Sequence, residues 1–104
     1  MRYDERASGQ QIEATVNDEL EISLPETRTA GYKWIVRRSG APILELLEDK
    51  TIPGTPGVGG TGRHLWRFRV LSPGDTDIEL HHIRPWEDSA EPSRTFRLKV
   101  RVRS

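Results

Sequence analysis

The fold is decided by the stretch TFRLKVRVR, residues 95–103, in which apolar and basic side chains alternate without interruption. Successive side chains of a β-strand point to opposite faces, so strict alternation buries one face of the strand and leaves the other in water. The residues of the apolar face are Phe96, Leu98, Val100 and Val102. The residues of the solvated face are Arg97, Lys99, Arg101 and Arg103. This stretch therefore predicts a strand covered by a core on one side.

The same period of two recurs along the rest of the chain. It predicts further strands over residues 10–16, 20–24, 32–37, 63–71 and 76–83. We also expect a strand over 43–49, because Pro42 and Pro53 bound this short apolar run. Seven short strands separated by turn residues are typical of an all-β, immunoglobulin-like β-sandwich of about seven to eight antiparallel strands.

Length and composition narrow the classes of protein. The 104 residues suffice for one domain, so we expect 1–104 to be a single domain with a flexible N-terminal segment over 1–10. The chain has no cysteine, which excludes disulfides, a thiol nucleophile and a thiolate metal site. The 16 basic residues balance 16 acidic ones, so no bulk charge attracts nucleic acid or an anionic membrane.

The compartment stays open. Residues 1–10 are polar and lack the apolar core of a secretory signal, and no apolar run approaches membrane-spanning length. For the chain as it stands this favours the cytoplasm, whereas a leader removed beforehand would place it in the periplasm or outside the cell.

The connections between the predicted strands fall into two groups. Three are short turns, at residues 17–18, 38–42 and 72–75. Three are longer, at residues 25–31, 51–62 and 84–94. If successive strands run up and down, alternate connections share one end of the sandwich. The three long loops are then predicted to form a single binding edge on a rigid scaffold.

The first long loop contains Thr29, Ala30 and Gly31. Thr29 offers a hydroxyl that both donates and accepts, and Gly31 permits a left-handed backbone. An ordinary loop, in which Thr29 bonds its own backbone, is the alternative on these residues alone. Tyr32 and Trp34 are two residues apart and share a face, which predicts that both belong to the core.

The second long loop contains Gly57, Val58, Gly59 and Gly60. It superficially resembles a phosphate-binding loop, but it leads into a strand and so lacks the helix N-terminus that would hold an anion. Glycines at this density instead allow bare backbone to approach another surface closely. A hairpin tip without a binding role is the alternative.

The third long loop begins with Arg84, Pro85 and Trp86. Pro85 fixes φ at the entry of the loop. Trp86 lies in a polar stretch outside the alternating pattern, and Trp and Arg are the residues most enriched at interface hot spots. The alternative is that Trp86 folds back over one end of the core.

In order and separation, the three loops resemble the chagasin family of cysteine peptidase inhibitors, peptidase inhibitor family I42. The family pattern is Asn-Pro-Thr-Thr-Gly-Tyr/Phe, then Gly-x-Gly-Gly, then Arg-Pro-Trp/Phe. The resemblance extends from about Ile12 to Val102. The chain departs from the pattern in the first loop, where Thr27 replaces Asn, Arg28 replaces Pro and Ala30 replaces the second Thr.

The resemblance implies a monomeric sandwich that inhibits papain-like cysteine peptidases reversibly and tightly, with no cofactor. It implies that Thr29 sits at the catalytic centre of the peptidase, that residues 57–60 line one wall of the cleft, and that Arg84 and Trp86 pack on the other. A preformed loop end binds well because its ordering cost is met on folding. Ordering Arg28 costs about 0.5–1.5 kcal/mol on binding, which affects affinity and target range more than fold.

Two other classes of function compete. The first is an immunoglobulin-like interaction module whose loops bind a partner that is not a peptidase. The second is an enzyme or metal protein built on His64, His81 and His82. His81 and His82 are adjacent on a predicted strand and point to opposite faces, and no nucleophile–base pair is visible, so we predict neither catalytic nor metal-binding residues.

Overall fold

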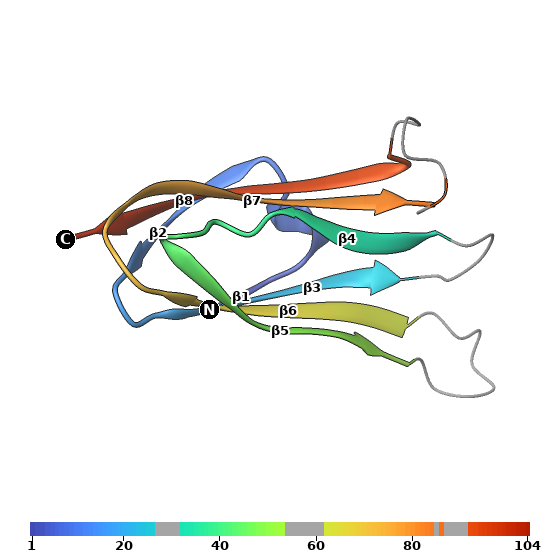
Figure 1. Cartoon of the computed structure of the whole chain (residues 1–104), viewed down its shortest axis with the longest axis horizontal. Coiled ribbons are helices and arrows are strands. Elements are labelled where there is room, and N and C mark those ends of the chain that lie inside the picture. Colours follow the sequence, from blue (N-terminus) through green and yellow to red (C-terminus); the bar gives the residue numbers. More distant parts are fainter. Residues whose placement is uncertain (27–31, 54–61, 85, 87–91) are drawn as a thin grey trace.

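The computed structural model describes residues 1–26, 32–53, 62–84, 86 and 92–104. In that part of the chain the regular elements are strands and one short 3₁₀ turn. They are β1 (Arg2–Tyr3), η1 (Glu5–Ala7), β2 (Gln10–Thr15), β3 (Glu19–Glu26), β4 (Lys33–Arg38), β5 (Leu44–Ile52), β6 (Gly62–Val70), β7 (Gly74–Ile83) and β8 (Arg94–Arg103). Figure 1 shows them as two layers of strands that run along the long axis of the molecule. The predicted all-β, immunoglobulin-like sandwich is confirmed.

Each layer is a four-stranded sheet. One sheet has the order β1-β3-β6-β5, and the other has the order β2-β8-β7-β4. The antiparallel pairs are β3 with β6, β5 with β6, β4 with β7, and β7 with β8. The prediction of antiparallel pairing is wrong for two edge strands, because β1 lies parallel to β3 and β2 lies parallel to β8. The tight turn after β2 carries the chain into the opposite sheet, so β2 pairs with the open edge of β8, which runs in the same direction.

The core lies between the sheets and is formed by the apolar parity of the strands. Along β8 every second residue is buried, which confirms the alternation predicted for residues 95–103. The buried apolar residues are Ala7, Ala14, Leu20, Ile22, Leu24, Trp34, Leu44, Trp66, Phe68, Val70, Ile78, Leu80, Phe96, Leu98, Val100 and Val102. Burial of apolar surface at about 25 cal/mol per Å² is the main force that holds the two sheets together.

The short turns close one end of the sandwich. Asn17 takes a positive φ of 78°, and the carboxylate of Asp18 accepts a 2.9 Å hydrogen bond from the backbone N–H of Thr15. Gly40 takes a φ of 82° at a point where an added Cβ would lie 2.6 Å from Cδ1 of Leu44. Glycine is required there both by the left-handed backbone and by the contact with the core.

The N-terminal segment, expected to be flexible over residues 1–10, contains β1 and η1 in the structure. The backbone N–H of Glu21 donates to the carbonyl of Met1 at 2.8 Å, and that of Gly9 donates to the carbonyl of Arg97 at 2.7 Å. Ala7 is buried against the core cluster. Elements of two and three residues are too short to show a period, which is why the alternating pattern did not predict them.

The strand ends that lead into the three long loops lie together at the opposite end from the short turns (Figure 1). We call this the loop end. In the β1-β3-β6-β5 sheet, Glu26 pairs with Gly62 and Ile52 pairs with Arg63. Lys33 lies opposite Ile83. The arrangement that strand parity predicts for these ends is the one found.

Candidate functional site

Two of the predicted site residues, Arg84 and Trp86, belong to the described part of the chain. The others lie outside the described residues: Thr29, Ala30, Gly31, Gly57, Val58, Gly59, Gly60 and Pro85. The side chain of Trp86 is 68% exposed. It therefore does not cover the end of the core, which was the alternative for this residue.

Arg84 is held at the loop end by an aromatic ring from the strand region that follows the first loop. Its guanidinium carbon lies 4.5 Å from the centroid of the Tyr32 ring, a cation–π arrangement. The stack continues inward, because Tyr32 packs on His82 with ring centroids 5.2 Å apart and planes 14° from parallel. Arg84, the first residue of the third loop, is thus anchored on the residue that follows the first loop.

His82 also binds the far side of the third loop. Its Nδ1 lies 2.6 Å from the hydroxyl of Ser93, and the backbone N–H of Ser93 donates to the carbonyl of His82 at 2.9 Å. Burial, and secondarily the positive charge of Arg94, lower the pKa of His82, while Glu26 opposes the shift. The neutral ring is the form that suits this stack. His82 shares the parity of Ile78 and Leu80, so it lies half-buried with its ring nitrogen partnered.

The stack of rings continues into the core. Trp34 contacts His82 with centroids 5.1 Å apart and meets Trp66 edge-on at 6.3 Å and 89°. Trp66 stacks in turn on His64, at 4.2 Å and 17°. Trp34 is buried, as predicted. Tyr32, also predicted to belong to the core, is only partly buried, and the guanidinium of Arg84 packs on its ring.

A buried polar cluster lies at the inner end of this stack, and sequence reasoning missed it. The carboxylate of Glu26 faces Nδ1 of His64 at 2.9 Å and accepts a 3.0 Å hydrogen bond from the hydroxyl of Thr51. Nε2 of His64 contacts the carboxylate of Asp49. Glu26 is 3% exposed and His64 is 9% exposed. A charged group is stable in a protein interior only when it is paired, and this cluster provides the paired groups at the loop end.

The cluster also bridges the two sheets. The backbone N–H of Trp34 donates to the Glu26 carboxylate at 3.4 Å, and its indole N–H donates to the carbonyl of Pro25 at 3.0 Å. Burial disfavours the charged form of Glu26, but hydrogen bonds from His64 and Thr51 outweigh it and hold the pKa of this carboxyl below its ordinary value.

A signal for two members of the cluster was present in the alternation. Glu26 continues the buried parity of Leu20, Ile22 and Leu24 in β3. In the same way, His64 belongs to the buried parity of β6. A polar residue at a buried position of a strand indicates that its side chain has a hydrogen-bonding partner. Asp49 carried no such signal, because the register of β5 shifts between Leu46 and Glu48.

The enzyme and metal hypotheses find no support in the described part of the chain. His81 points to the outer face, where its Nε2 lies 3.5 Å from Glu79, while His82 points inward. Residues 1–26, 32–53, 62–84, 86 and 92–104 contain no group of three side chains placed to hold a metal ion. Within the same residues no helix is long and apolar enough to cross a membrane.

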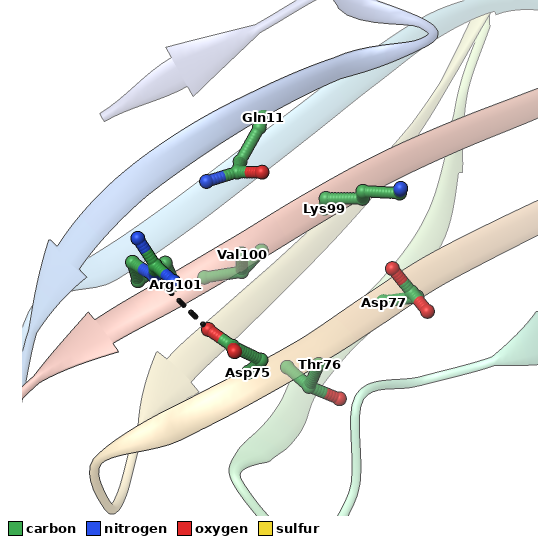
Figure 2. Close-up of a pocket in the computed structure, with 7 residues that line it drawn as sticks. All are labelled: Gln11, Asp75, Thr76, Asp77, Lys99, Val100 and Arg101. Carbon is green, nitrogen blue, oxygen red and sulfur yellow. Dashed lines mark hydrogen bonds and ion pairs between the residues drawn. The ribbon is translucent and has the colours of Figure 1, made fainter.

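A hollow on the outer face of the β2-β8-β7-β4 sheet is lined by residues of β2, β7 and β8 (Figure 2). Figure 2 shows its charged side chains interleaved, with Arg101 paired to Asp75 at 3.3 Å. Lys99 and Asp77 lie beside this pair. This mixture of signs at Asp75, Asp77, Lys99 and Arg101 is typical of a solvated outer face.

Comparison with known proteins matches residues 13–100 to the model of the chagasin family of peptidase inhibitors, I42. The chain belongs to this family. The resemblance predicted from the three loops is therefore confirmed, and the family is one of inhibitors rather than enzymes.

Individual members of the chagasin family are similar over most of the chain. Amoebiasin-2 of Entamoeba histolytica is 30% identical over 95 residues, which cover 88% of this chain and 76% of that protein. Chagasin of Trypanosoma cruzi is 23% identical over 100 residues, which cover 91% of each chain.

Solved structures agree. The crystal structure of the cysteine protease inhibitor EhICP2 from Entamoeba histolytica superposes with a TM-score of 0.84 at 25% identity, over 98% of this chain and 93% of that one. The structure of PbICP-C in complex with falcipain-2 has a TM-score of 0.63 at 18% identity, over 99% of this chain and 90% of that one, and shares the fold.

Proposed function

We propose that this chain is a reversible, tight-binding inhibitor of papain-like cysteine peptidases and that it works as one domain, residues 1–104. The loop end enters the active-site cleft and excludes substrate. Thr29 faces the catalytic centre, residues 57–60 follow one wall, and Arg84 and Trp86 pack on the other. No step of chemistry is required, because occupation of the cleft by a folded edge is sufficient.

One observation supports this assignment above the others. Trp86 is 68% exposed and follows two residues after Arg84, whose guanidinium packs on the ring of Tyr32. Exposing a large indole is unfavourable in water, and Trp and Arg are typical anchors of protein interfaces. Membership of a family of peptidase inhibitors supports the peptidase as the partner.

The experiment is a titration of the purified chain against papain and cathepsin L, with recovery of activity on dilution to establish reversibility and substrate competition to establish that the cleft is occupied. We expect stoichiometric inhibition at nanomolar to micromolar concentrations. If both enzymes, and other papain-like peptidases, stay fully active at micromolar inhibitor, the proposal fails. Capture of a different protein through Trp86 would then favour the interaction-module alternative.

A further inference from the structure

The stems of the first and second loops are joined by one set of side chains. Glu26 is the last residue of β3, immediately before the first loop. Asp49 and Thr51 lie near the end of β5, before the second loop, and His64 lies near the start of β6, after it. All four contribute side chains to the buried polar cluster at the loop end, so side-chain contacts as well as the backbone ladders join these strand ends.

His64 is the centre of the cluster, and its two ring nitrogens face two carboxylates. Nδ1 lies 2.9 Å from Glu26, and Nε2 contacts Asp49. A neutral imidazole has a single N–H and can donate to only one of them, whereas the imidazolium donates to both. The geometry therefore suits the charged ring, and Trp66 stacked on it at 4.2 Å keeps its plane fixed.

The burial of the two carboxylates differs, and this difference decides which contact breaks when His64 loses a proton. The side chain of Glu26 is 1% exposed and must keep a donor, while that of Asp49 is 43% exposed and can turn to water. A neutral His64 thus stays with Glu26 and releases Asp49. Because Asp49 belongs to β5, the strand end that enters the second loop then loses its contact with His64 and keeps only the hydrogen bond from Thr51 to Glu26 among these side-chain contacts.

We propose that Glu26, His64 and Asp49 are positioning residues which, with His64 as the imidazolium, hold the stems of the first and second loops in the arrangement that binds a peptidase. This inference rests on the proposed function. It assigns a role in binding to residues that do not themselves touch the peptidase. It also predicts tighter binding at pH values where His64 carries its proton.

Other groups packed around His64 have to be separated from it. Glu26 comes from β3, and Asp49 and Thr51 from β5. The titratable group that approaches from the other sheet is His82, which reaches the cluster through Trp34. Since His82 is unchanged in a His64 variant, the ratio of the two inhibition constants at each pH isolates the contribution of His64.

The test measures the inhibition constant against papain between about pH 5 and pH 8, the range in which histidine changes charge, for the wild type and His64→Gln. Glutamine fills similar space and does not titrate. We expect His64→Gln to bind about tenfold more weakly at the acid end, equivalent to about 1.4 kcal/mol, and the difference to shrink wherever the wild-type ring is neutral. An inhibition constant for His64→Gln equal to that of wild type at the acid end would overturn the proposal.

Asp49→Asn gives a second route if His64→Gln does not fold. An asparagine can donate to or accept from Nε2, so the ring needs only one proton, and we expect a flatter pH profile with inhibition retained. Asp75→Asn, at an ion pair on the outer face, is the matched control and should leave the profile unchanged. A profile of Asp49→Asn identical to that of Asp75→Asn contradicts the proposal.

A spectroscopic measurement separates failure of this inference from failure of the proposed function. Nitrogen NMR of the free protein should show both His64 ring nitrogens protonated at the pH values where wild type and His64→Gln differ in affinity, and the signal should change with the amide signals of Glu26 and Thr51 on titration. If papain is not inhibited but these signals move together, the proposed function fails alone. If papain is inhibited but they move independently, the positioning role fails alone.

Discussion

The guanidinium carbon of Arg84 lies 4.5 Å from the centre of the Tyr32 ring, and this contact joins the first loop to the third. The two residues flank neighbouring strands of the β2-β8-β7-β4 sheet, where Lys33 pairs with Ile83. Tyr32 is in turn stacked on His82, which is bound to Ser93 on the return of the third loop. The position of Arg84 therefore depends on Tyr32, which lies between the first loop and β4.

Tyr32→Leu should weaken inhibition while Tyr32→Phe should not. Leucine removes the aromatic face under Arg84, and an exposed cation–π contact is worth about 0.5–1 kcal/mol, so we expect the inhibition constant to rise about two- to fivefold. Phenylalanine keeps that face. The measurement is inhibition of papain, with Tyr3→Leu in β1 as a control that should leave the constant unchanged. Equal constants for Tyr32→Leu and wild type would show that Arg84 is positioned without the ring.

Trp86→Ala should separate binding from stability. The indole is 68% exposed, so its loss should change the free energy of unfolding by less than about 0.5 kcal/mol. As an interface anchor it should contribute about 2 kcal/mol to binding, a rise of about 30-fold in the inhibition constant. Leu71→Ala, another exposed apolar side chain, at the end with the short turns, is the matched control and should affect neither quantity. An unchanged inhibition constant for Trp86→Ala would remove this residue from the interface.

Glu26 makes the fold sensitive to acid. The folded protein holds the pKa of Glu26 below the ordinary value of 4.5, so folding favours its ionised form. This contribution to stability is complete above the ordinary pKa and is lost as the pH falls through the lower, folded pKa. We expect the drop in the free energy of unfolding from about pH 6 to about pH 2.5 to be smaller in Glu26→Gln than in wild type. Urea unfolding at both pH values measures it, and Glu45→Gln, on the exposed side of β5, should keep the wild-type drop.

Substitution by alanine should change the stability of the fold by different amounts at two glycines that share a left-handed backbone conformation. Gly9 and Gly40 both have positive φ, of 87° and 82°, so alanine at either adds about 1 kcal/mol of backbone strain. At Gly40 the new Cβ would also lie 2.6 Å from Cδ1 of the buried Leu44, whereas at Gly9 it would meet nothing within 4 Å. We expect Gly40→Ala to be the more destabilising by about 1–3 kcal/mol in thermal or urea unfolding. Equal losses would mean that Leu44 moves aside freely.

The strands were predictable because their signal is local. A residue such as Leu98 or Val100 is buried by the parity of its own strand, and that parity is visible in the sequence. The seven predicted strands accordingly correspond to β2 through β8, with ends displaced by a few residues. Parity along the chain also placed the ends of the three long loops together, since each reversal changes the end of the sandwich.

Features set by the third dimension could not be predicted in the same way. The parallel pairing of β2 with β8 joins Gln10 to Leu98, residues from opposite ends of the chain, and depends on which sheet edge is open. The contact of Asp49 with His64 depends on the irregular register of β5, which no local period reports. The stacking of Arg84 on Tyr32 likewise depends on β4 and β7 being neighbours in one sheet, a pairing that no local period reports.

The direction of β8 has a practical consequence. The strand begins at Arg94 beside the loops and ends at Arg103, so the carboxyl terminus projects from the opposite pole of the molecule (Figure 1). A bead, sensor surface or fused reporter attached through Ser104 would be held roughly one strand length away from Trp86. Ten residues at about 3.3 Å each give a separation of about 30 Å, enough for an immobilised inhibitor to capture a peptidase without obstruction by its own anchor.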